Sequence, residues 1–190
     1  MSTAVRAAGS LRSAVAADLA ATAAYRGDRH EFRSLADAVV QGLRLALVSD
    51  AFAAQVLYRL KVALQARRVP LLPRICHRLA MSTAQVAIGD PVTLGPGAYF
   101  AHGQVVIDGI VRIGSGVVIF PWVTIGLRAG DLRGATIGDN VTIGTGAKVI
   151  GPVNIGDGAV VGANAVVVDD VAAGATVVGA PARPSRDPVR

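Results

Sequence analysis

The sequence contains very little cysteine and few aromatic residues. Cys76 is the single cysteine among 190 residues, so the chain cannot form an internal disulfide and a reducing compartment is expected. Aromatic residues make up only 4% of a chain that is 52% hydrophobic, so small and aliphatic side chains must fill the core. A chain of this length suits one ordinary domain, or one domain with an appendage.

Long apolar runs are absent as well. A membrane-spanning helix needs about 18 or more consecutive apolar residues, and the longest candidate, residues 38–64, carries four charged side chains. The first 20 residues are also interrupted by charges, where a signal peptide needs an apolar segment. We therefore expect a cytoplasmic protein without a membrane span.

The net charge of +6 is unevenly distributed. Residues 1–85 carry 12 basic and 5 acidic side chains, residues 86–179 carry 4 and 7, and residues 180–190 carry 3 and 1. Basic surfaces can bind nucleic acid, but these lack interleaved aromatic residues and a known nucleic-acid motif. We interpret them as solvated arginine faces and expect no nucleic-acid partner, with an acidic partner or an anionic cofactor as the alternative.

Residues 10–80 have the apolar spacing of helices, with apolar residues three and four positions apart. Ser34 is a predicted N-cap, and Gly42 together with the pair Ser49-Asp50 is predicted to divide the stretch into two helices. No catalytic motif is recognisable there. We therefore predict an N-terminal helical region, residues 1–83, that serves packing and assembly.

From residue 86 onward the period of the aliphatic residues changes to six. The pattern places one extra residue between Val106 and Ile113, and a six-residue insertion between Ile125 and Ile137. The aliphatic–glycine pairs are Ile88-Gly89, Leu94-Gly95, Ile113-Gly114, Ile125-Gly126, Ile137-Gly138, Ile143-Gly144, Ile155-Gly156 and Val161-Gly162, and Phe100, Val106, Ile119, Val149 and Val167 hold the register between them.

A six-residue repeat is typical of a hexapeptide β-helix, in which each repeat forms one short strand and a turn. Three repeats make a triangular coil of about 18 residues, with the aliphatic side chain pointing inward. We expect about five coils, a β-helix domain at residues 84–179 and a basic C-terminal tail at residues 180–190.

Five motifs stand out in the repeat region: "FAHGQVVI", "VTIG" at 123–126, "LRAGDLRGAT", "TIGDNVTIGTGAKVIGPVNIGDGAVVGANAVVVDDV" and "VVGAPARP" at 177–184. With these motifs the repeats resemble the hexapeptide-repeat acyltransferases, and most closely their serine O-acetyltransferase branch. The resemblance implies a mainly β fold, a left-handed parallel β-helix preceded by a short α-helical region. It also implies a homotrimer, with a dimer of trimers as the alternative, and acetyl-CoA bound between neighbouring subunits.

The resemblance also implies roles for individual residues on the acceptor side. His102 is the implied catalytic base, and an imidazole that titrates near neutral pH suits the deprotonation of a hydroxyl. Arg133 is the implied ligand of an acceptor carboxylate. Trp122, one coil after His102, is predicted to form a wall of the substrate pocket, with apolar packing at a trimer boundary as the alternative.

On the cofactor side, Thr145 and Ala163 are implied to offer backbone groups to the pantetheine arm of CoA. Arg183 matches a basic residue that meets the CoA phosphates, and Arg186 and Lys148 are predicted to add positive charge. A solvated corner lysine is an equal alternative for Lys148. We expect no metal, because no cluster has the spacing of metal ligands.

The sequence departs from the pattern of the branch at three positions. Ala87 replaces an aspartate that orients the histidine, Ala101 replaces an aspartate that contacts the amino acid, and Gly134 replaces a second histidine. Asp90 and Asp108 are expected on other faces of the coil. Gln85 or a backbone carbonyl is therefore the expected partner of the imidazole.

Together these features predict an acetyl-CoA-dependent O-acetyltransferase that acts on serine or a related hydroxy amino acid. The alternatives are an O-acetyltransferase of a sugar or natural-product hydroxyl, and a weakly active trimeric scaffold. A complex with a pyridoxal-phosphate synthase is disfavoured, because the chain ends in "SRDPVR" without the terminal isoleucine that the branch docks.

Overall fold

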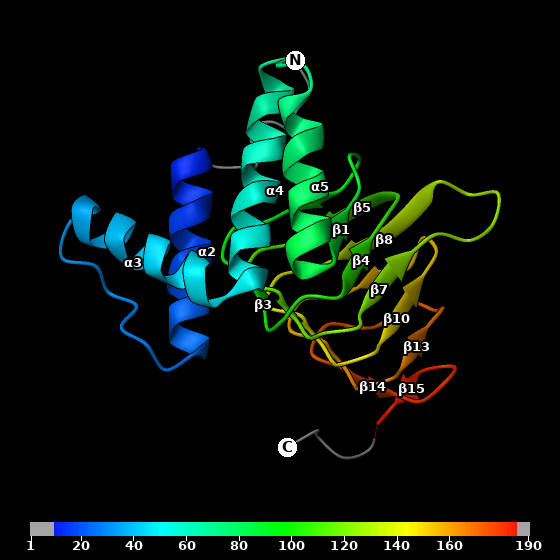
Figure 1. The fold of residues 1–190 in the computed structure, drawn as a ribbon. Coiled ribbons are helices and arrows are strands. Elements are labelled where there is room, and N and C mark those ends of the chain that lie inside the picture. Colours follow the sequence, from blue (N-terminus) through cyan, green and yellow to red (C-terminus); the bar gives the residue numbers. More distant parts are fainter. Residues whose placement is uncertain (1–9, 186–190) are drawn as a thin grey trace.

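The computed structural model describes residues 10–185, which form helices packed against one end of a parallel β-solenoid (Figure 1). Helices α4 and α5 lie side by side on the first coil, while α3 extends away from the solenoid. The helices are α2 Leu11–Tyr25, α3 Leu35–Val48, α4 Asp50–Ala66 and α5 Leu72–Ala84.

Two serine caps define where the central helices begin. The Ser34 hydroxyl accepts a hydrogen bond from the Asp37 N–H at 3.1 Å, and the Ser49 hydroxyl accepts one from the Phe52 N–H at 3.3 Å. Each cap satisfies a backbone donor that has no partner within the helix. The predicted cap at Ser34 and the division at Ser49 are confirmed, whereas Gly42 lies inside α3 and ends no helix.

The solenoid has three sheets, which form the three faces of the coil. Their strand orders are β1-β4-β7-β10-β13 in the first sheet, β11-β8-β5-β2 in the second and β15-β14-β12-β9-β6-β3 in the third. All the pairings are parallel except β14 with β15, which is antiparallel. The strands are β1 Val86–Ile88, β2 Thr93–Leu94, β3 Tyr99–Phe100, β4 Val105–Ile107, β5 Ile110–Ile113, β6 Val118–Ile119, β7 Thr124–Gly126, β8 Arg133–Ile137, β9 Thr142–Ile143, β10 Lys148–Ile150, β11 Asn154–Ile155, β12 Val160–Val161, β13 Val166–Val167, β14 Thr176–Val178 and β15 Arg183–Pro184.

The stacked aliphatic residues form the core, with one correction to the predicted register. Ile107 is 0% exposed, whereas Val106 is 42% exposed and points outward. The assignment of Val106 to the core was therefore wrong. The extra residue lies between Phe100 and Ile107: Val86 pairs with Val105, 19 positions on, while Val106 pairs with Thr124, 18 positions on. A strand alternates its side chains, so a shift of one residue exchanges inside and outside.

The predicted insertion forms a loop between β7 and β8 that projects from the prism (Figure 1). Thr124 pairs with Lys148, 24 positions on, which is one coil plus the six inserted residues. Arg128 anchors the loop by donating a hydrogen bond from Nη2 to the Val168 carbonyl at 2.8 Å. The loop ends where Arg133 begins β8.

A buried ion pair fastens the helices to the first coil. Arg59 of α4 is 7% exposed and donates from Nε and Nη2 to the Asp18 carboxylate of α2, at 2.8 and 3.1 Å. The same guanidinium donates to the carbonyls of Leu94 and Gly95 at 2.5 and 2.6 Å. Asp18 in turn accepts from the Ala98 N–H at 3.1 Å. One pair of side chains therefore connects α2, α4 and the solenoid.

One apolar core runs from α4 and α5 into the coils, and includes Tyr58, Ala84 and Ile88. The boundaries that we predict at residues 83 and 179 stay predictions. Within residues 10–185 no single helix is long and apolar enough to cross a membrane, although α3 and α4 together meet the criterion as a pair bent by 118°.

Candidate active site along one edge of the solenoid

Four of the predicted site residues lie along one edge of the prism. His102, Trp122, Thr145 and Ala163 occupy successive corners, each of which connects a strand of the third sheet to a strand of the first. We call this line of corners, residues 101–104, 120–123, 144–147 and 162–165, the His102 edge.

Backbone hydrogen bonds hold these corners in register. The Trp122 N–H donates to the Gln104 carbonyl at 2.9 Å, the Gly146 N–H to Pro121 at 2.9 Å, and the Asn164 N–H to Thr145 at 2.8 Å. Each corner is thereby fixed to the next, so the solenoid sets the spacing along the His102 edge.

The corner that carries His102 contains the extra residue and packs against the end of α5. The Gln104 N–H donates to the Ala84 carbonyl at 2.9 Å. A Cβ on Gly103 would lie 1.8 Å from that same carbonyl oxygen, so only glycine fits there. The imidazole of His102 is exposed, and within residues 10–185 it has no hydrogen-bond partner. It is therefore free to meet a substrate.

A hollow of about 290 Å³ opens beside His102 between the solenoid and the helices. Its walls come from the start of α4, the ends of α2 and α5, and the His102 corner. Gln85 lines this hollow, so the structure brings the expected partner near the imidazole, although no hydrogen bond joins the two in the described residues.

Asp90 and Asp108 lie away from His102, as predicted. Asp90 accepts a hydrogen bond from the buried Nζ of Lys61 at 3.0 Å, which lowers the pKa of its carboxyl. Asp108 accepts from the adjacent Gly109 N–H at 2.9 Å. Neither can take the place of the orienting aspartate that the resemblance implies at position 87, where this chain has alanine.

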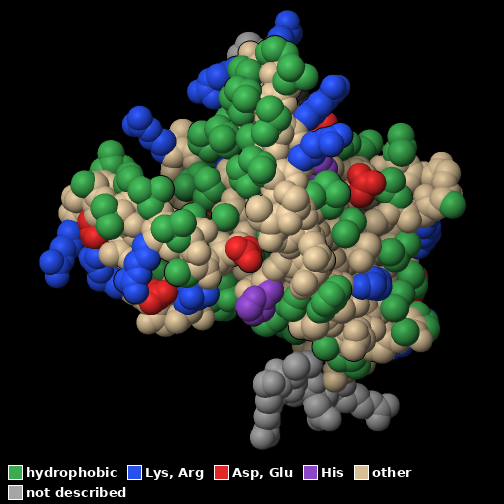
Figure 2. Space-filling model, in the orientation of Figure 1, with side chains coloured by type: hydrophobic (Ala, Val, Ile, Leu, Met, Phe, Trp, Pro, Cys, Tyr) green, Lys and Arg blue, Asp and Glu red, His purple; other side chains and the backbone are tan. Residues whose placement is uncertain are grey.

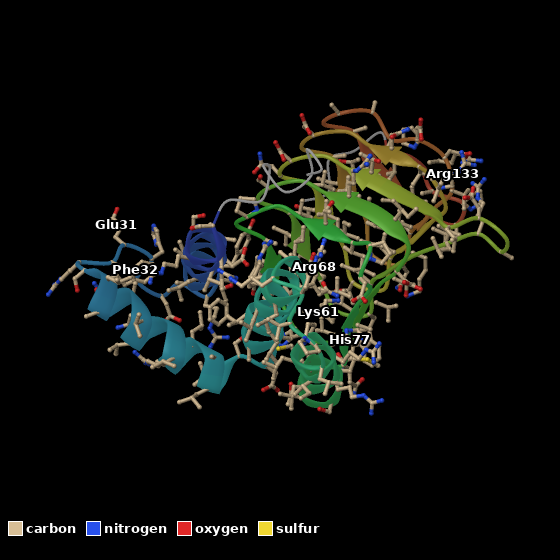
Figure 3. All side chains as sticks on the ribbon, turned by 90° about the horizontal axis from the view of Figure 1, so that it is seen from above. Glu31, Phe32, Lys61, Arg68, His77 and Arg133 are labelled. Atoms are coloured by element: carbon tan, nitrogen blue, oxygen red, sulfur yellow. The ribbon has the colours of Figure 1, made fainter. Side chains whose placement is uncertain are left out.

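Arg133 is not on the His102 edge. It begins β8 in the second sheet, and Figure 3 shows it beside the projecting loop. Its Nη2 pairs with the Asp131 carboxylate at 2.8 Å, and this hydrogen bonding lowers the pKa of Asp131 to about 2. Next to it, a Cβ on Gly134 would lie 2.4 Å from Val111 Cγ2, which explains why no histidine side chain fits there.

The basic residues predicted for the cofactor are distributed unevenly. Lys148 lies beside the His102 edge and donates from Nζ to the Trp122 carbonyl at 2.6 Å. Arg183, in β15, pairs with Asp169 at 3.2 Å and keeps 63% of its side chain exposed. Arg186 lies outside the described residues. Trp122 is 57% exposed, so its indole is available to a substrate or a neighbouring subunit.

Two charged residues in the hollow were missed by the motif analysis. Arg26 caps the end of α2, and Asp50 is the first residue of α4. Asp50 was read only as a helix divider, because helical residues far from the repeats carry no motif that would relate them to His102. Within residues 10–185 no group of three or more His, Cys, Asp and Glu side chains is arranged to hold a metal ion.

Comparisons with known proteins agree with this geometry. A family model described as "Bacterial transferase hexapeptide (six repeats)" matches residues 134–169. The structure is similar to soybean serine acetyltransferase complexed with serine, with a TM-score of 0.77 and 34% identity over 93% of this chain and 70% of that chain. The chain belongs to the serine acetyltransferase family.

Other members of the serine acetyltransferase family give the same result. A serine acetyltransferase from Synechococcus elongatus is 36% identical over 145 residues, which are 75% of this chain and 59% of that protein. A serine acetyltransferase in complex with CoA has a TM-score of 0.76 and 28% identity over 96% of this chain and 72% of that chain. The predicted parallel β-helix preceded by N-terminal helices is confirmed. The chain spans only 59% of the length of the curated relative.

Proposed function

We propose that this chain is an acetyl-CoA-dependent O-acetyltransferase that acts on serine or a related hydroxy amino acid, with His102 as the general base. The observation that carries the proposal is the placement of His102 on one edge with Thr145 and Ala163. That edge combines a free imidazole with corners matching the CoA-binding motifs. Solved relatives complexed with serine and with CoA support the choice of both substrates.

The reaction needs a base because a hydroxyl is a weak nucleophile near neutral pH. Acetyl-CoA supplies an activated acyl group. The imidazole of His102 takes the proton of the acceptor hydroxyl while the C–O bond forms, and returns it to sulfur as the C–S bond breaks. The backbone groups of Thr145 and Ala163 position the pantetheine arm, and Lys148, Arg183 and Arg186 offset the charge of the CoA phosphates.

A homotrimer completes the proposed site. Arg133 lies on a different face from His102 in its own chain, so the two can serve one substrate only if neighbouring subunits contribute one each. An isolated subunit would also leave the side chains of Trp122 and Val106 exposed, at 57% and 42%. Sedimentation velocity at micromolar concentration should give a trimer or a dimer of trimers, and a monomer would contradict the shared site.

The central test is a CoA-release assay with a panel of hydroxyl acceptors. His102→Ala should lower kcat/KM by about 10²- to 10⁴-fold, the usual contribution of a general base. The trimer and CoA binding should remain. His30→Ala, which removes a histidine between α2 and α3, is the matched control and should keep parental turnover. Near-parental activity of His102→Ala would remove His102 from the mechanism.

A sugar hydroxyl is the second candidate acceptor, because the exposed Trp122 offers an aromatic wall one coil from His102. Arg133→Ala separates the two acceptors. For an acceptor that bears a carboxylate, the loss of its ion pair with Arg133 should raise the KM of the acceptor by a factor equivalent to about 2–4 kcal/mol. The KM for acetyl-CoA should change little. For a neutral sugar the effect should be mild. A selective effect on acetyl-CoA alone would reassign Arg133 to the cofactor.

A further inference from the structure

The hollow beside His102 carries opposite charges that the proposed mechanism does not use. Arg26 and Asp50 both line it, at the end of α2 and the start of α4. Arg26 is 3.6 Å from the Asp28 carboxylate, while the Asp50 carboxylate has no hydrogen bond or ion pair within residues 10–185. The hollow that His102 lines therefore also contains an unpaired carboxylate, that of Asp50, which can bind a positively charged group.

Specific contacts fix both helix ends beside the His102 corner. The ring of Tyr25, the last residue of α2, stacks on that of Tyr99 in β3 with centroids 4.5 Å apart. Gln55 of α4 donates from Nε2 to the Ala98 carbonyl, immediately before β3, at 2.9 Å. Since β3 leads directly into the His102 corner, these contacts hold Arg26 and Asp50 over the corner and not on a mobile loop.

The chemistry of this arrangement suits an acceptor that carries an amine. A hydroxyl directed at His102 from within the hollow would place a neighbouring ammonium group near a carboxylate. The family aspartate expected to contact the amino acid is Ala101 in this chain, so its corner offers no carboxylate of its own. Charge-assisted hydrogen bonds are about twice as strong as neutral ones, so one carboxylate can select for an ammonium group.

We propose that Asp50 binds the ammonium group of the acceptor in the hollow beside His102, and so selects a hydroxy amino acid over a neutral sugar. The inference rests on the proposed function, which it deepens by supplying the missing acidic contact. Arg26 provides the opposite charge on the same wall, where it favours a zwitterion over a simple cation. Asp50 takes no part in the proton transfer itself.

The test compares two acceptors that differ only in the amine. L-Serine is assayed as the substrate, and 3-hydroxypropionate, which lacks the amine, is measured as a competitive inhibitor against it. In Asp50→Asn the KM for L-serine should rise roughly 10- to 100-fold, the range expected when a hydrogen bond to a charged group is lost. The inhibition constant of 3-hydroxypropionate should stay within about twofold.

Two further variants separate recognition from folding. Asp50→Glu restores the charge and should recover most of the affinity for L-serine. Asp108→Asn removes an exposed carboxylate elsewhere on the coil, keeps an oxygen for the Gly109 N–H, and should behave as the parent. Thermal unfolding of Asp50→Asn should remain close to the parental curve, because the loss at the first turn of a helix is usually below about 1 kcal/mol.

Each outcome decides the inference. An unchanged KM for L-serine in Asp50→Asn, or an equal loss of affinity for both compounds, would overturn the role of Asp50 while leaving the O-acetyltransferase standing. Turnover with sugars but with no amine-bearing acceptor would also overturn it. If none of the acceptors in the panel causes the parental protein to release CoA, the proposed function fails as well. The two failures are therefore distinguishable.

Discussion

Different kinds of contact stabilise the solenoid and the helical region. In the solenoid the same contact recurs in every coil: Ile107, Ile125 and Val149 stack at 0% exposure, with a parallel ladder between their strands. The helices share the apolar core through α4 and α5, and single polar residues of α4 add contacts to the first coil that are not repeated. Lys61, 2% exposed, donates to the Ile88 carbonyl at 2.7 Å, and the Tyr58 hydroxyl donates to the Val92 carbonyl at 2.9 Å.

The surfaces of the two regions differ as well. Basic side chains gather around the helices in the face shown in Figure 2. Helix α3 also keeps large apolar side chains exposed, with Leu47 at 86% and Leu35 at 73%. In the solenoid most aliphatic residues face inward. A repeat can lose one contact while its neighbours keep the same contact, whereas each polar contact of α4 with the coil is made by a different side chain.

The largest effect is expected from breaking the ion pair that fastens the helices. Burial raises the pKa of Asp18, and the hydrogen bond and charge of Arg59 oppose that shift. Arg59→Met would leave the Asp18 carboxylate buried with the backbone N–H groups of Ala98 and Gly97 as partners and no positive charge beside it. Removing one partner of a buried pair usually costs about 3–5 kcal/mol. Chemical denaturation should show this loss, with the helices separating before the solenoid unfolds.

The matched control replaces both partners with apolar residues. Asp18→Leu combined with Arg59→Met removes the uncompensated charge, and such replacements are often neutral or stabilising. The double variant should therefore recover a large part of the stability that the single variant loses. A double variant as unstable as Arg59→Met alone would show that the helices depend on the hydrogen bonds to Leu94 and Gly95 instead.

A smaller effect on stability is expected from substitutions that test the register of the solenoid at Val106 and Ile107. Ile107→Ala removes a side chain that is 0% exposed and should cost about 2–5 kcal/mol through lost burial and the cavity left behind. Val106→Ala, one residue earlier and 42% exposed, should change the stability by less than about 0.5–1 kcal/mol. Unfolding curves of the two variants measure the difference. Equal losses would contradict the observed register.

The sequence predicts the solenoid well because its signal is repeated. The six-residue period establishes the coil, the number of turns and the place of the insertion, since many residues report the same fact. The only error in register fell at Val106, where two consecutive β-branched residues precede Ile107 and either could be read as the inward one. Local cap chemistry was equally readable, as Ser34 and Ser49 show.

The contacts between the two regions could not be predicted. Asp18 and Arg59 lie 41 positions apart, and nothing in the helical spacing relates either residue to the other or to the coil. Asp50 came to lie beside His102 in the same way, through the docking of α4 on β3. Long-range polar contacts occur once each, so they leave no period in the sequence.

The smallest effect concerns acid stability in the helical region. A hydrogen bond from Arg29, supported by the Arg33 N–H, lowers the pKa of Asp37 to about 2 from its usual 3.8. A carboxyl with a lowered pKa stabilises the fold fully above its unfolded pKa, and this contribution is lost as the pH falls toward 2. Asp37→Asn should therefore flatten the decline in unfolding free energy between about pH 4 and pH 2, measured by denaturation at each pH.

Asp131→Asn offers the same comparison in the solenoid, where the pKa of Asp131 is also about 2. If the helices are the weaker region, the flattening should be visible at the first unfolding step for Asp37 and only at the second for Asp131. Parental slopes in both variants would show that neither pair contributes to folding stability.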